Sequence, residues 1–134
     1  MTKQSINPEG APAPVGPYVQ VTVAPPGGRI VYCSGAVALD ADGNVVGEGD
    51  IVAQTRQTLE NLRLALAAAG ATFDDVVKIN SYLTDFSLFP QIAPVRAEYL
   101  KEPFPASTSV EVSSLIFPEL MIEIEAIAIV HDEP

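Results

Sequence analysis

The stretch FPASTSVEVSSLIFPELMIEIEAIAIV, residues 104–130, decides the fold. β-Branched residues alternate with other types on both sides of Phe117-Pro118-Glu119, which predicts a hairpin of two β-strands around a proline-containing turn. In the second strand, alternation puts two sets of side chains on opposite faces. One face carries Ile122, Ile124, Ala126, Ala128 and Val130, and the other carries Met121, Glu123, Glu125, Ile127 and Ile129.

The face with the two glutamates is unusual because it is apolar at both ends and acidic in the middle. A solvated sheet face rarely combines methionine and isoleucines with carboxylates, so we expect this face to be covered. Partly buried carboxylates need hydrogen-bond partners or a function. Glu123 and Glu125 are therefore candidate functional residues.

Length and composition indicate one folded domain spanning residues 1–134. With 48% hydrophobic and 18% charged residues, the chain is not of the disordered class. A net charge of −10 argues against nucleic-acid partners, which need a basic surface, and against anionic membranes. No apolar run approaches the roughly 18 residues of a spanning helix.

Cysteine and histidine usage predicts no disulfide and no metal. The single cysteine, Cys33, has no partner within the chain, which fits a cytoplasmic location. The N-terminus lacks the apolar segment of a signal peptide. The lone histidine, His131, has no Cys or His cluster around it, so we predict no metal ligand and no cofactor.

The N-terminal part is predicted from its turn residues. Residues 1–17 hold four prolines and two glycines, which predicts an irregular lead-in. Residues 18–24 and 29–35 alternate as strands around Pro25-Pro26-Gly27-Gly28, and we expect them to form a hairpin.

A helix of about five turns is predicted after Asp50, a typical N-cap residue. Its apolar stripe comprises Thr55, Leu59, Leu62, Leu66 and Ala69, with Gly70 at the C-terminal stop and Gln54 outside the stripe. Residues 76–83 alternate as a strand. A second helix is expected within residues 92–101, its regular part starting close to Pro94, because an interior proline costs about 3 kcal/mol.

These elements predict an α+β domain with one mixed sheet and two helices on one face. The other sheet face still carries Val76, Ile127 and Ile129. We therefore expect that face to meet another subunit, making the protein a homo-oligomer. Clefts between subunits are natural places for a small-molecule site.

Six segments taken together resemble the RidA/YjgF family, and the match covers nearly the whole chain. They are residues 13–18 (APVGPY), 32–35 (YCSG), 54–61 (QTRQTLEN), 104–106 (FPA), 110–112 (VEV) and 122–128 (IEIEAIA). The resemblance implies a chorismate-mutase-like fold and a homotrimer whose sheets form a central barrel, with a cleft between each pair of subunits. It also implies hydrolysis of reactive enamines and imines to 2-oxoacids and ammonia.

Carried over by position, Tyr18, Ser34 and Gly35 match residues that line the family's cleft. Glu123 matches the carboxylate that positions or activates water. Water must lose a proton as it attacks the imine carbon, and a carboxylate accepts it. The alternative for Glu123 is a structural carboxylate satisfied by the backbone or by Lys78.

The segment after FPA departs from the deaminases that the chain resembles. They carry an arginine there that binds the substrate carboxylate; here Ser107, Thr108 and Ser109 follow. The family's asparagine on the second helix corresponds to Ala93. A missing charge-assisted pair is worth about 1.5–3 kcal/mol.

Two cations, Arg96 and Lys78, are candidates to replace that arginine, although each is expected to be a solvated surface residue. The sequence therefore leaves two functions open. One is an enamine or imine hydrolase, and the other is a non-catalytic trimeric module that binds a small metabolite or regulates other proteins.

Overall fold

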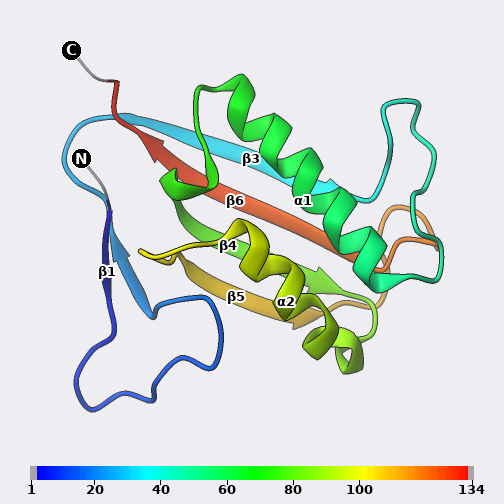
Figure 1. Ribbon diagram of the computed structural model, residues 1–134, viewed down its shortest axis with the longest axis horizontal. Coiled ribbons are helices and arrows are strands. Elements are labelled where there is room, and N and C mark those ends of the chain that lie inside the picture. Colours follow the sequence, from blue (N-terminus) through cyan, green and yellow to red (C-terminus); the bar gives the residue numbers. More distant parts are fainter. Residues whose placement is uncertain (1–2, 133–134) are drawn as a thin grey trace.

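Four strands form the main sheet of the computed structural model, which describes residues 3–132 (Figure 1). The strand order is β3 (Arg29–Val37), β6 (Ile122–Val130), β4 (Val76–Leu83) and β5 (Ala106–Glu111). β6 is antiparallel to both of its neighbours, whereas β4 and β5 run parallel. The sheet is therefore mixed, as predicted.

β5 and β6 are both strands, but they do not form the predicted hairpin. β4 lies between them, and β6 uses its two edges to pair with β3 and β4. The parallel pairing of β4 and β5 is made through a helical crossover, which puts β5 at the edge of the sheet. The proline-containing segment, residues 112–121, therefore passes the end of β4 to connect β5 with β6, and it does not form a tight turn.

Helix α1 (Ile51–Ala68) matches its prediction closely. The Asp50 carboxylate accepts a hydrogen bond of 3.1 Å from the Ala53 amide, and Gly70 ends the helix region at φ +77°. Leu59, Leu62 and Leu66 are fully buried on the face that meets the sheet. α1 and α2 cover the same face, as Figure 1 shows.

Gln54 is completely buried, contrary to its predicted place outside the stripe. Its amide donates 3.2 and 2.9 Å hydrogen bonds to the carbonyls of Gly47 and Glu119, and its oxygen accepts a 2.8 Å bond from the Met121 amide. The side chain thus joins the loop before α1 to the loop before β6. A buried amide satisfied in this way replaces an apolar contact without leaving unpaired polar groups.

Helix α2 (Phe89–Tyr99) begins five residues before the predicted start at Pro94 and follows a short 3₁₀ turn, Phe86–Leu88. Pro90 fits the first turn because amides there have no partner within the helix. Pro94 lies inside the helix, where its missing N–H would have met the carbonyl of Pro90, close to the N-terminal end. Pro94 therefore costs the helix only one backbone hydrogen bond, and that bond lies near its N-terminal end.

The two faces of β6 differ as their residues predict. The set that begins with Ile122 is buried beneath the helices, and the set that contains Glu123 is half-buried on the open face. Val76 does not share that open face. A register shift between Val76 and Lys78 turns its side chain into the core, where it is fully buried.

The N-terminal lead-in contains a strand that the sequence did not predict. β1 (Gln4–Ile6) pairs antiparallel with β2 (Val21–Val23) in a separate two-stranded sheet. The predicted hairpin between residues 18–24 and 29–35 is therefore wrong. Gly27 and Gly28, both with positive φ, redirect the chain between β2 and β3, and β3 pairs with β6 instead.

Candidate functional site

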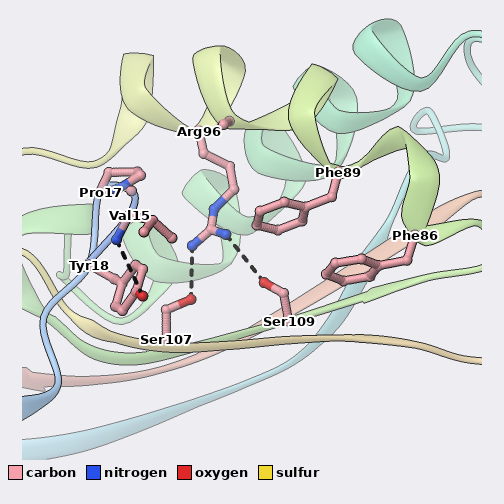
Figure 2. Close-up of a pocket in the computed structure, with 10 residues that line it drawn as sticks. Val15, Pro17, Tyr18, Phe86, Phe89, Arg96, Ser107 and Ser109 are labelled. Carbon is pink, nitrogen blue, oxygen red and sulfur yellow. Dashed lines mark hydrogen bonds between the residues drawn. The ribbon is translucent and has the colours of Figure 1, made fainter. Parts of the chain in front are cut away.

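A pocket with a volume of about 230 Å³ opens beside helix α2, and we call it the Arg96 pocket (Figure 2). Three segments build it: the loop before β2, helix α2 with its preceding turn, and β5. Its lining residues are Val15, Gly16, Pro17, Tyr18, Phe86, Phe89, Ala93, Arg96, Ser107 and Ser109.

Arg96 extends from α2 toward β5 and is 3% exposed, so its predicted place as a solvated surface cation is wrong. Its Nη2 donates a 3.0 Å hydrogen bond to Ser107 Oγ, and its Nη1 donates a longer 3.4 Å bond to Ser109 Oγ. Its Nε has no hydrogen-bond partner within residues 3–132. Ser107 and Ser109 have small side chains, and the guanidinium of Arg96 occupies the space next to them.

Burial lowers the pKa of Arg96 to about 10, which leaves it charged at neutral pH. No carboxylate of the described residues pairs with it, whereas Arg29, Arg56 and Arg63 form ion pairs with Asp132, Glu98 and Glu60. A buried charge without a counter-ion is costly to a fold. Arg96 is thus electrostatically distinct from the exposed arginines.

The structure brings Tyr18, Ala93, Arg96, Ser107 and Ser109 together in this pocket, all of them candidates from the sequence. It adds aromatic walls that the sequence reasoning missed. Phe86 and Phe89 stack with ring centroids 4.9 Å apart and an angle of 8° between planes. The signal was present as two phenylalanines three residues apart at a helix start.

Thr108 lies apart from the pocket because neighbouring residues of a strand point to opposite faces. It is exposed, and its hydroxyl accepts a 2.9 Å hydrogen bond from Lys78 Nζ. Lys78 therefore belongs to the open face of the sheet and not to the Arg96 pocket.

The other candidate residues meet on that open face. Ser34 and Gly35 lie in a β-bulge, since the pairing of β3 with β6 shifts register between Cys33 and Ala36. A Cβ atom added to Gly35 would lie 2.1 Å from Glu123 Oε2, so the carboxylate rests directly against this glycine. A glycine inside a strand is the sequence signal for such a bulge or close approach.

Glu123 and Glu125 differ in their surroundings. Glu125 accepts hydrogen bonds from the Tyr82 hydroxyl and, at 3.3 Å, from Asn80 Nδ2. The bond from Tyr82 raises the pKa of that phenol. Within residues 3–132, no hydrogen bond reaches the Glu123 carboxylate. Glu123 and Glu125 line an open depression with Tyr82, Val112, Ser114, Leu115 and Ile116.

The sheet separates Arg96 from Glu123 within one chain. Ser107 pairs with the buried Ile79, so it points to the helix-covered side together with Arg96. Glu123 alternates with the buried Ile122 and Ile124 and points to the other side. A small molecule bound to one chain therefore cannot contact both charged groups.

The part of the chain that the structure describes holds no group of three or more His, Cys, Asp or Glu side chains able to bind a metal ion. None of its helices is long and apolar enough to cross a membrane. Cys33 is half-buried, and burial raises the pKa of its thiol.

The chain is similar to known proteins over nearly its whole length and theirs. Residues 8–130 match the family model described as Endoribonuclease L-PSP. The chain is 42% identical to 3-aminoacrylate deaminase RutC of Acinetobacter baylyi, over 96% of this chain and 98% of the relative. It is 34% identical to 2-iminobutanoate/2-iminopropanoate deaminase of Dermatophagoides farinae, with the same coverage of 96% and 98%.

A solved structure has the same fold over nearly the full chain. The crystal structure of the Rid family protein YyfB from Yersinia pestis, described as a protein of unknown function, superposes with a TM-score of 0.86. The two sequences are 36% identical, and the superposition covers 97% of this chain and 100% of the other.

Proposed function

The chain belongs to the Endoribonuclease L-PSP family, also named RidA/YjgF, and from this membership we propose that it hydrolyses small imines or enamines. The products are a carbonyl compound and ammonia. Relatives named for the deamination of 3-aminoacrylate and of 2-iminobutanoate support the reaction class.

In the proposed reaction, an enamine first takes up a proton on carbon and loses one from nitrogen, which makes it the imine. Water then adds to the imine carbon as Glu123 accepts one proton of that water, and the Glu123 carboxyl passes this proton to the imine nitrogen, giving a carbinolamine. Transfer of the hydroxyl proton to nitrogen expels ammonia and leaves the carbonyl. Every atom of water is accounted for in the two products.

Glu123 supplies the observation that carries the proposal. Its carboxylate lies against Gly35 on the open sheet face and has no hydrogen-bond partner in the described chain, unlike Glu125. A carboxylate free of local donors is available to hold and deprotonate water. The half-buried flanks of β6 keep such a water in a restricted space.

We further propose a chorismate-mutase-like homotrimer, with the open sheet faces turned toward a central barrel. Ile30 and Tyr32 on β3 are 57% and 75% exposed, and they pair with Ile129 and Ile127 on β6. An apolar surface of this kind favours burial against another subunit. Each cleft would then combine the Arg96 pocket of one subunit with Ser34, Gly35 and Glu123 of another.

Hydrolysis of freshly generated 2-iminopropanoate, followed by competition with semicarbazide trapping, tests the reaction. Glu123→Gln is expected to lower kcat/KM about 10²- to 10⁴-fold, the usual contribution of a general base. Glu125→Gln is the matched control and is expected to stay within about tenfold of wild type, because Glu125 is occupied by Tyr82 and Asn80.

Two results would contradict the proposal. If the wild-type protein does not accelerate hydrolysis of 2-iminopropanoate or of carboxylate-free enamines, the chain is a binding or regulatory module and not an enzyme. A monomeric mass in solution at micromolar concentration would remove the shared cleft. Ribonuclease activity is not proposed, because a net charge of −10 opposes binding to a polyphosphate backbone.

A further inference from the structure

Arg96 has donors that nothing in the described chain uses. A guanidinium carries five N–H groups in a planar fork. The 3.0 and 3.4 Å bonds to Ser107 and Ser109 use two of them, both with neutral acceptors, and Nε is among the remainder. The side chain is 3% exposed. A charge buried in this way fits a site whose counter-ion arrives with a ligand.

The shape and lining of the Arg96 pocket limit what that ligand is. Its volume of about 230 Å³ is below the roughly 300–1,000 Å³ of pockets for drug-sized molecules, so the ligand is a small metabolite. Val15, Phe86 and Phe89 give it apolar walls, which favour an aliphatic chain next to the charged group.

The anion is best matched by a carboxylate. A guanidinium pairs with a planar carboxylate through two parallel hydrogen bonds, and the hydroxyls of Ser107 and Ser109 add neutral donors beside it. A phosphate carries a charge of about −1.5 to −2 near neutral pH and favours several cationic contacts. Within the described lining, Arg96 is the pocket's single cation.

We propose that the Arg96 pocket binds the carboxylate of a small aliphatic acid, with the guanidinium supplied by helix α2 instead of by β5. Carboxylate binding at Arg96 does not depend on the proposed hydrolysis.

Ser107→Asp is the decisive variant because it changes binding and stability in opposite directions. The Ser107 hydroxyl already lies 3.0 Å from Arg96 Nη2, so an aspartate there supplies an internal counter-ion. We expect the variant to be more stable than wild type in urea unfolding and to lose carboxylate binding. Loss of fold cannot produce that pair of results. Ser107→Asn, neutral and similar in size, is expected to weaken binding far less.

The ligands for calorimetric titration are 2-oxobutanoate and butanone, which replaces the carboxylate with a methyl group. Wild type is expected to bind 2-oxobutanoate about 10- to 150-fold more tightly than butanone, the value of a charge-assisted pair. Ser107→Asp should remove that difference. Lys78→Gln removes the cation on the opposite sheet face and should leave binding unchanged.

The proposal is overturned if wild type binds neither ligand, or binds both equally. It also fails if Ser107→Asp binds 2-oxobutanoate as wild type does, if Lys78→Gln is the variant that loses binding, or if inorganic phosphate competes as strongly as a carboxylate. Failure of the proposed hydrolysis is a separate outcome. If the protein binds the carboxylate through Arg96 but does not hydrolyse imines, the hydrolase proposal is wrong and the carboxylate site stands. If Ser107→Asp hydrolyses imines with the same KM as wild type, the carboxylate site is wrong and the hydrolase proposal stands.

Discussion

Gly35→Ala tests whether the bulge of β3 holds the Glu123 carboxylate in its working position. The added methyl carbon would lie 2.1 Å from Oε2, 2.6 Å from Cδ and 2.9 Å from Cγ of Glu123. Carbon contacts are favourable only near about 3.5–4.0 Å, so the carboxylate must withdraw by about 1 Å or more. The glutamate side chain is flexible, and it is the group that yields.

The expected loss follows from that displacement. Misplacing a reacting group by about 1 Å costs about 10²-fold in rate, so kcat/KM should fall about 100-fold, or about 2.7 kcal/mol. Stability should change by less than about 1 kcal/mol, because Gly35 is exposed and is not among the glycines with positive φ. A large loss of activity with an unchanged urea midpoint is the signature of a positional effect.

A double-mutant cycle in the semicarbazide competition assay separates this cause from others. In a Glu123→Gln background, Gly35→Ala should lower kcat/KM by less than about twofold, because the group it displaces has already lost its function. The reasoning is refuted if Gly35→Ala retains full activity. It is equally refuted if Gly35→Ala lowers kcat/KM by the same factor of about 100 in the Glu123→Gln background.

Three further predictions concern stability and charge. Gln54→Leu should lower the free energy of unfolding by about 3–4.5 kcal/mol, at about 1–1.5 kcal/mol for each of three lost hydrogen bonds, measured by urea denaturation; a loss below about 1 kcal/mol would contradict it. Glu125→Gln should lower the pKa of Tyr82 in an ultraviolet titration of tyrosinate, because the hydrogen bond to Glu125 raises it. The stabilisation from that bond is present below the ordinary phenol pKa and is lost at higher pH as Tyr82 ionises, so an unchanged titration would refute the pairing. Ser107→Arg alone should be destabilising because it puts two guanidinium groups in one pocket, whereas Ser107→Arg with Arg96→Ser should restore 2-oxobutanoate binding; a double variant that binds no better than Arg96→Ser would refute the exchange.

Elements with local signals were predictable from the sequence. The N-cap at Asp50, the apolar stripe and the stop at Gly70 lie within one segment, and α1 forms where they indicate. The strand over residues 76–83 matches β4 in both bounds. Strand pairing was not predictable in the same way. It depends on contacts far apart in sequence, and alternation does not say which strand lies beside which.

The site shows the same division between local and tertiary information. Glu123 and Gly35 were candidates, but their contact depends on a bulge that only pairing with β6 reveals. Arg96 was assigned to the surface because arginine is usually exposed. The helical spacing of Arg96 indicates burial instead. Arg96 lies four residues after Ile92 and three before Tyr99, which puts it on the buried face of α2.

On these proposals, the missing arginine of β5 does not mean a missing anion site. A substrate carboxylate needs a guanidinium at a position in space, and either a strand or the helix above it can provide one. Ser107 and Ser109 make room for Arg96 to reach that position from α2, and Ala93 leaves the pocket open beside it. Substitutions at 107 and 96 are therefore coupled, and neither residue predicts the pocket's ligand without the other.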